Sequence, residues 1–314
     1  MAVAGEVITD LVPAGEDGLF RAAPGGSPAN VAVGLARLDV VARMLARLSD
    51  DVLGVRLRAH LERNGVDLSH AVRAPEPSSL AIVALQEDGS AAYDFRVDGT
   101  ADWQWTDDEL AGALAGVQAL HVGSLGLTTA PGGAVLRRLA GRAARTATVS
   151  FDPNVRHLLM GSPEEVREVV RELLAVAAVV KASDEDIAWL EPGKSIEDVA
   201  SSWLEQGPDL VVVTRGGEGA LAVGPASGEV HRPGVPVDVV DTVGAGDSFM
   251  AALLAGLARR GLLGADRRGD LRALSGDAVG GLVDDAVRAS AITCSRRGAD
   301  PPRAAELGGV FADA

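Results

Sequence analysis

DTVGAGDSFMAALLAGL, residues 241–257, joins a glycine-rich turn to an apolar helix. Every residue from Phe249 to Leu257 is apolar or glycine, and a helix that is apolar on all faces is typical of a protein core. Arg259 and Arg260 follow in the last turn, where positive charge complements the helix dipole, and Gly261 supplies a left-handed cap. The stretch predicts a buried helix with an open turn at its N-terminus.

The turn itself is suited to bind an anion. Gly244, Ala245 and Gly246 leave the backbone uncovered, so N–H groups can converge on a phosphate at the positive end of the helix. Asp247 beside them would repel phosphate, and its presence is explained if it takes a proton from a hydroxyl that receives the phosphoryl group. A glycine-rich turn with an ordinary first-turn acid fits the same residues, so the rest of the chain has to decide.

Composition narrows the class of protein. The chain has 314 residues, enough for one large α/β domain or two small ones, and its 47% hydrophobic content is sufficient for a core. A net charge of −15 argues against a nucleic-acid partner. We find no secretory or membrane segment, and the single cysteine, Cys294, predicts a buried helix residue in a reducing, cytoplasmic compartment. Neither zinc-ligand spacing nor a P-loop motif is present.

Strands and helices alternate regularly from about residue 107. This alternation predicts an α/β fold with a doubly wound, mostly parallel sheet flanked by helices, which binds ligands beyond the carboxyl ends of its strands. The predicted elements are helix 107–115, strand 117–122, helix 132–144, strand 146–151, helix 163–175, strand 177–181, helices 183–190 and 195–205, strand 210–214, β segments 219–223 and 229–231, and two helices after residue 270.

The N-terminal part contains a second glycine motif. A short strand is predicted to end near Asp10, and PGGSPANVAVGLARL follows at residues 24–38. There Gly25-Gly26 predicts a tight turn, Ser27 an N-cap and Pro28 the first helical position. Asn30 in the first turn could face a ligand, or it could be another capping residue. A strand over 40–48 and a helix over 51–64 come next.

An appended β structure is predicted from two further runs. Residues 79–85 and 91–97 flank a turn and are too polar for a central parallel strand. Together with residues 11–22 they predict a small β lid inserted in a single domain that spans 1–314. Trp103 and Trp105 are expected to pack the lid or a subunit contact.

Polar residues cluster where the predicted parallel strands end. The segments are His121–Ser124, Asp152–Arg156, Lys181–Ser183 and Thr214–Gly217. His121 is expected to be a hydrogen-bonded structural histidine rather than a catalytic one.

These residues resemble the ribokinase-like sugar kinases, the PfkB family. PGGSPANVAVGLARL resembles its N-terminal signature and DTVGAGDSFMAALLAGL its C-terminal one, while GEVITD, FDPNVR, VTRGGEGA and CSRRGA match in order and spacing. YDFRVDGTADWQWT and VKASDEDIAWL are similar to the bacterial fructokinase branch. The resemblance implies transfer of the ATP γ-phosphate to a sugar hydroxyl, with fructose giving fructose 6-phosphate as the first expectation.

The resemblance also implies roles for individual residues. Asp247 would be the base, with Gly244, Ala245, Gly246 and the Asp247 amide as the anion hole. The sugar would contact Asp10, Gly25, Gly26 and Asn30, and Arg156 would reach the substrate or the transferring phosphoryl group. The nucleotide would contact Lys181, Ser183, Thr214, Arg215, Gly217, Gly219 and Gly246.

Metal sites and partners follow from the same resemblance. ATP would act with Mg²⁺, for which Asp186 is the candidate, and Asp241 with Val243 matches a monovalent-cation (K⁺) site. The family's NxxE motif is altered here to Ser183-Asp184-Glu185-Asp186, and Asp39 and Ser49 stand where glycine is usual. The expected partners are a sugar, ATP and a second copy bound through the lid, without nucleic acid or membrane.

Other functions stay open. Ribose, 2-keto-3-deoxygluconate or a nucleoside would be alternative acceptors, and a non-catalytic sugar-sensing relative would use the same fold. A Rossmann dehydrogenase is excluded because no GxGxxG motif opens the chain.

Overall fold

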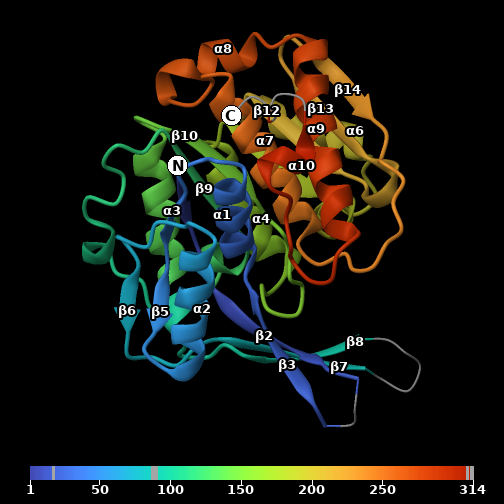
Figure 1. Ribbon diagram of the computed structural model, residues 1–314. Coiled ribbons are helices and arrows are strands. Elements are labelled where there is room, and N and C mark those ends of the chain that lie inside the picture. Colours follow the sequence, from blue (N-terminus) through green and yellow to red (C-terminus); the bar gives the residue numbers. More distant parts are fainter. Residues whose placement is uncertain (16–17, 86–90, 309–310, 312–314) are drawn as a thin grey trace.

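A large twisted sheet forms the centre of the molecule (Figure 1). The structure, a computed structural model, describes residues 1–15, 18–85, 91–308 and 311. Within them, eight strands lie in the order β14-β13-β12-β11-β10-β9-β1-β4, and all neighbours are parallel except that β13 is antiparallel to both β12 and β14. The strands are β1 Ala2–Ala4, β4 Arg43–Leu45, β9 Ala119–Gly123, β10 Thr148–Asp152, β11 Val179–Ser183, β12 Leu210–Thr214, β13 Ala220–Gly224 and β14 Gly228–Arg232. The predicted mostly parallel sheet is confirmed.

Helices cover both faces of this sheet and bury two separate apolar clusters, as a doubly wound fold requires. One face carries α1 Ser27–Arg37, α2 Val52–Arg63, α7 Ala245–Arg259 and α9 Gly276–Cys294. The other carries α3 Gly132–Ala143, α4 Pro163–Leu174, α5 Asp184–Leu190 and α6 Ile196–Glu205. Two short helices, α8 Arg268–Arg272 and α10 Ala304–Leu307, complete the C-terminal part. None of the described helices has the length and apolar character needed to cross a membrane.

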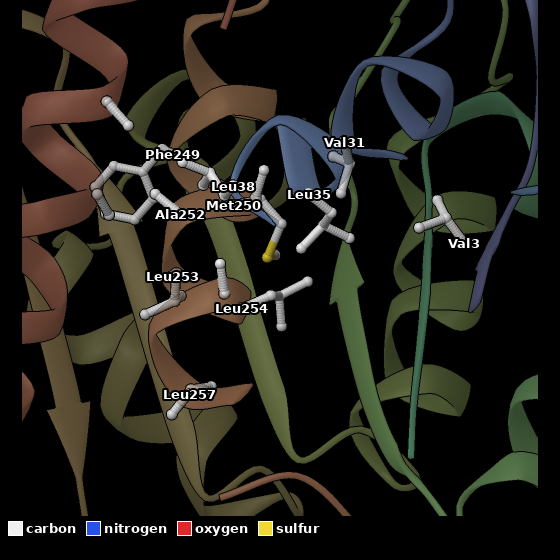
Figure 2. Close-up of a cluster of buried hydrophobic side chains, with 14 of the residues drawn as sticks. Val3, Val31, Leu35, Leu38, Phe249, Met250, Ala252, Leu253, Leu254 and Leu257 are labelled. Carbon is white, nitrogen blue, oxygen red and sulfur yellow. The ribbon is translucent and has the colours of Figure 1, made fainter. Parts of the chain in front are cut away.

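Helix α7 lies in the centre of its layer, between α1 and α9. Its residues from Asp247 to Leu257 are all buried, so the helix predicted to be apolar all round is confirmed. Figure 2 shows Met250 on the side of α7 that faces Leu35 of α1, whereas the ring of Phe249 lies on the opposite side of α7. Burial of each large aliphatic side chain contributes about 1.5–3 kcal/mol, so this packing fixes the N-terminus of α7 firmly in space.

Four strands form a small sheet that projects from the rest of the molecule (Figure 1). Its order is β3-β2-β7-β8, with β2 Ile8–Pro13, β3 Phe20–Gly25, β7 Leu80–Leu85 and β8 Ala91–Arg96. This is the predicted lid, whose first hairpin is longer than the expected 11–22. Two further strands, β5 Arg47–Ser49 and β6 Val72–Ala74, pair beside α2.

Several predicted elements are wrong in detail. The single N-terminal strand is two strands in two sheets, because the chain leaves β1 after Ala4 and enters β2 at Ile8. The strand over 40–48 is likewise divided into β4 and β5. The helix over 107–115 is reduced to a 3₁₀ turn at Asp108–Leu110, since Gly112 follows with a φ of 75°, outside the helical region.

Two side-chain predictions also need correction. Trp103 and Trp105 are buried against the body of the fold, in the cluster that contains Leu136 and Leu139, rather than in the small sheet. Cys294 ends α9 and is only partly buried.

Candidate active site

The N-terminus of α7 presents free backbone donors. Gly244 is its N-cap with a φ of 77°, and a Cβ there would lie 2.6 Å from that of Ala299, so both backbone and space favour glycine. The N–H of Ala245 donates to the Thr242 carbonyl at 3.2 Å, so this member of the predicted anion hole is already engaged. Among the described residues, no backbone acceptor meets the N–H groups of Gly246 and Asp247. Two donors therefore face outward at the positive end of the helix.

The Asp247 carboxylate is held from α1. Ser27 Oγ donates to its Oδ1 at 2.6 Å, and Asn30 Nδ2 donates to its Oδ2 at 2.8 Å. The prediction of Ser27 as N-cap is wrong, because Gly26 is the cap and the Ser27 side chain turns to Asp247 instead. The two glycine motifs, more than two hundred residues apart in the chain, thus meet in one hydrogen-bonded cluster.

A buried ion pair lies directly behind this helix end. Lys181 Nζ donates to Asp152 Oδ2 at 2.8 Å, and both side chains are almost completely buried. A Cβ on Gly246 would lie 2.9 Å from Lys181 Nζ, so the ammonium group touches the first turn of α7. Burial raises the pKa of Asp152 to about 6, against the opposing effect of Lys181. Burial alone would lower the pKa of Lys181, but Asp152 and two further acids hold it above its usual value. Lys181 is therefore a cation at neutral pH.

His121 lies on the same face of the sheet and is neutral. Burial, assisted by the charge of Lys181, lowers its pKa to about 3. Its Nδ1 lies 3.0 Å from Ser150 Oγ, while Nε2 has no hydrogen-bond partner among the described residues. The expected hydrogen-bonded structural histidine is thus satisfied at one ring nitrogen only.

Asp10 lies on β2, where the small sheet faces the body. Burial raises the pKa of Asp10 to about 6, and the positive charge of the Arg156 guanidinium opposes this rise. Arg156 also donates to Asn154 Oδ1 at 2.7 Å. A Cβ on Gly25 would lie 2.2 Å from Asp10 Oδ2, so only glycine leaves room for this carboxylate. Asp10 and Gly25, two of the predicted sugar-contacting residues, are therefore in close contact.

The predicted nucleotide-contacting residues follow the adjacent strands β11 and β12. Ser183 and Thr214 are paired in register, and Thr214 Oγ1 donates to the Ala182 carbonyl at 3.4 Å. Arg215 is paired with Glu218 at 2.6 Å, which raises its pKa. The remaining two are glycines: Gly217 lies in a 3₁₀ turn, and Gly219 packs on the backbone of the chain after β14.

The candidate metal ligands already accept backbone hydrogen bonds. Asp186 Oδ1 accepts from Val155 N at 2.7 Å and Oδ2 from Ser183 N at 2.8 Å, and Ser183 Oγ accepts from Asp186 N in return, a capping box of α5. Asp241 accepts from Val243 N at 3.1 Å and Gly298 N at 2.8 Å. The described residues contain no group of three or more His, Cys, Asp or Glu suited to a metal. The Asp186 carboxylate keeps further lone pairs after these two hydrogen bonds, and magnesium is commonly bound through one or two carboxylates together with substrate phosphates.

Sequence reasoning gave no role to Ser27 towards Asp247 or to Asp152 towards Lys181. Ser27 lies inside the first glycine motif, but its favourable capping chemistry concealed the longer-range contact. Asp152 directly follows the predicted strand 146–151, and Lys181 ends the predicted strand 177–181, so opposite charges at the ends of neighbouring strands were the available signal.

Comparison with known proteins identifies relatives of this chain. The pfkB family of carbohydrate kinases matches residues 1–305. A fructokinase of Klebsiella pneumoniae is 37% identical over 264 residues, which cover 83% of this chain and 85% of that enzyme. The ATP-bound fructokinase of Xylella fastidiosa superposes with a TM-score of 0.88 at 26% identity, covering 100% of this chain and 98% of its own. The fructokinase of Vibrio cholerae O395, solved with fructose, ADP and calcium, gives 0.79 at 29% identity, with 95% and 93% covered. The chain belongs to the pfkB family of carbohydrate kinases.

Proposed function

We propose that residues 1–314 act as one ATP-dependent sugar kinase domain, which transfers the γ-phosphoryl group of ATP to fructose and releases fructose 6-phosphate and ADP. The observation that carries this proposal is Asp247, a carboxylate at the N-terminus of α7 beside two backbone N–H groups that meet no backbone acceptor within the described part of the chain. A phosphate-binding helix end with a carboxylate in its first turn suits transfer to a hydroxyl. The fructokinase relatives support fructose as the acceptor.

Asp247 acts as the base. The acceptor hydroxyl gives its proton to Asp247 while its oxygen forms a bond to the γ-phosphorus, and the bond from phosphorus to the bridging oxygen breaks as ADP leaves. A carboxylate has about four lone-pair positions, so Asp247 can accept this hydroxyl in addition to Ser27 and Asn30. General-base assistance is worth about 10²–10⁴ in rate.

The helix end and Lys181 stabilise the charge on the transferring group. Each backbone donor aimed at that charge is worth about 10²–10³ in rate, and the N–H groups of Gly246 and Asp247, which no backbone acceptor of the described residues engages, can supply it. The ammonium group of Lys181, held by Asp152, adds positive charge immediately behind them. Magnesium bound to the ATP phosphates would neutralise part of their charge, with Asp186 placed to hold a metal-bound water.

The sugar lies between Asp10 of the small sheet and Asp247 of the body. Asp10 accepts its hydroxyl protons, Gly25 and Gly26 leave space for its ring, and Asn30 shares its amide between Asp247 and the sugar. Arg156 reaches the substrate or the transferring phosphoryl group from the end of β10. The nucleotide extends over the ends of β11 and β12, along Ser183, Thr214, Arg215, Gly217 and Gly219.

The direct test is ATP turnover across fructose, ribose, 2-keto-3-deoxygluconate and adenosine, with detection of ADP. The proposal expects fructose to have the highest kcat/KM. A higher kcat/KM for another acceptor would support kinase activity but contradict fructose as the acceptor. If the protein binds sugar but releases ADP with none of the four compounds, this result would contradict kinase function and favour a sugar-sensing protein.

We also propose a homodimer through the small sheet, in the cytoplasm. Phe20, the first residue of the edge strand β3, and Leu19 before it are 48% and 53% exposed, and exposed apolar residues at a strand that has no second neighbour among the described strands favour a partner. Sedimentation should give twice the 32.1 kDa chain mass, and Phe20→Asp should reduce it to one chain. A single-chain mass for the unaltered protein would contradict the dimer.

A further inference from the structure

The chain crosses four times between the body and the small sheet. The crossings are residues 5–7 between β1 and β2, 25–26 between β3 and α1, 75–79 between β6 and β7, and 97–101 between β8 and the 3₁₀ turn Ala101–Trp103. Any displacement of the small sheet relative to the body has to take place at these segments.

One buried carboxylate joins three of them. Asp102 lies in the 3₁₀ turn directly after the fourth crossing and is 2% exposed. Its Oδ1 accepts the Val7 N–H of the first crossing at 2.8 Å, and its Oδ2 accepts the hydroxyl of Ser79, in the third, at 2.6 Å. The Ser79 hydroxyl also lies 2.5 Å from Thr100 Oγ1. Both carboxylate oxygens are thus occupied by donors from different chain crossings.

The second crossing packs on the first. Gly26 has a φ of 99°, and a Cβ on it would lie 2.5 Å from the carbonyl oxygen of Glu6. No side chain separates these two backbones. Asp102 therefore links the first, third and fourth crossings by hydrogen bonds, and the second crossing is joined to them through its backbone contact with Glu6.

A buried acid without a cation is an expensive way to join backbone segments. Asp102 makes no ion pair with a described lysine or arginine, so the hydrogen bonds alone compensate for its burial. The burial of Asp102 instead fixes the relative positions of the segments that it joins. Asp10 lies just beyond the first crossing, and Ser27 and Asn30, which hold Asp247, lie just beyond the second.

We propose that Asp102 is a positioning residue for the reaction: by tying the crossings together, it keeps Asp10 on the small sheet at a fixed distance from Asp247 on the body. This inference rests on the proposed function for its kinetic consequence. It predicts that loss of Asp102 impairs sugar binding selectively, since the nucleotide residues on β11 and β12 do not depend on the crossings.

The test compares Asp102→Ala with Asp209→Ala. Asp209 is also buried, accepts hydrogen bonds from Arg268 and Arg272, and precedes β12, at the opposite end of the strands from Asp247. Asp102→Ala should raise the sugar KM about tenfold or more, with the ATP KM changed less than about twofold. Asp209→Ala should lower the thermal midpoint but leave both KM values unchanged.

Two milder variants keep the test decisive if Asp102→Ala folds poorly. Ser79→Ala removes one donor and should raise the sugar KM about threefold. Asp102→Asn keeps an oxygen for the Val7 N–H and has a nitrogen for Ser79, so it should restore the sugar KM to near its original value. Equal increases in the two KM values, or an unchanged sugar KM in both Asp102→Ala and Ser79→Ala, would overturn the proposal.

Hydrogen exchange gives a readout that does not need catalysis. In Asp102→Ala the amides of residues 5–11 and 78–82 should exchange about tenfold faster or more. In Asp209→Ala the amides of the same two segments should exchange at the rate of the unaltered protein. Unchanged exchange at both segments in Asp102→Ala would overturn the anchoring role. If the unaltered protein phosphorylates no sugar, the proposed function fails, and exchange alone then decides whether Asp102 ties the crossings.

Discussion

Replacing Glu6 with glutamine should stabilise the protein at alkaline pH and leave its stability at acidic pH almost unchanged. Glu6 is 2% exposed on the first crossing, where its Oε2 accepts the Gly126 N–H at 3.1 Å. Burial raises the pKa of Glu6 from 4.5 to about 7. A glutamine oxygen can accept the same hydrogen bond without the cost of a buried charge.

The sign follows from proton binding. The folded state keeps the Glu6 proton up to about pH 7, whereas the unfolded chain loses it near pH 4.5, so the folded state binds more protons in that interval. The contribution of this group to the free energy of unfolding is therefore greatest below pH 4.5 and is lost as pH rises through the folded pKa. At 1.36 kcal/mol per pKa unit, the loss amounts to roughly 3 kcal/mol.

Urea unfolding of the unaltered protein and of Glu6→Gln, at about pH 5 and about pH 8.5, measures this difference. We expect a small difference in the free energy of unfolding at the lower pH and a gain of about 3 kcal/mol for Glu6→Gln at the higher pH. Glu205→Gln is the matched control, since Glu205 is exposed on α6 and should show no pH-dependent gain. A gain of equal size at both pH values, or a loss at the higher pH, would refute the reasoning.

Three further predictions concern the site. Asp10→Ala should raise the sugar KM about 10-fold to 100-fold, as expected for loss of a charged hydrogen bond, with little change in the ATP KM; equal effects would contradict sugar contact. Lys181→Met should destabilise the fold by about 3–5 kcal/mol in urea unfolding, because Asp152 is left buried without its partner. Adding Asp152→Asn should restore stability but not turnover, and recovery of turnover would exclude a role for Lys181 in charge stabilisation. Potassium should accelerate turnover relative to sodium, and Asp241→Ala should abolish that difference; a rate insensitive to potassium would remove the cation site.

Much of the fold could be predicted from sequence because its elements carry local signals. The strand over 210–214 is observed at those residues, and α7 follows from an apolar run without a charged residue. Asp39, where glycine is usual in the family, has a φ of 60°, so the position does require the left-handed conformation that aspartate tolerates.

The errors have a common physical origin in contacts between distant residues. Nothing in the apolar opening of the chain shows that Gly5–Val7 leaves one sheet for another, because both strands are compatible with the same pattern. Ser27 is suited to an N-cap by its local sequence, but its hydroxyl donates a hydrogen bond to the Asp247 carboxylate of α7 instead. Tertiary structure decides between such equally good local partners.

The buried acids were the least predictable part. Glu6 and Asp102 are charged residue types that composition would place at the surface, and only the meeting of the chain crossings makes their burial useful. By contrast, Asp247 could be singled out from sequence because a carboxylate in a phosphate-binding turn conflicts with the simplest electrostatic expectation.

The most direct test of the account is the turnover of Asp247→Ala measured together with its sugar affinity by calorimetry. Asp277→Ala is the matched control, since Asp277 is an exposed first-turn acid of α9, the helix packed against α7. We predict that Asp247→Ala lowers kcat by about 10² or more while the sugar Kd stays within about threefold, and that Asp277→Ala changes neither. Near-normal turnover in Asp247→Ala would contradict its role as the base.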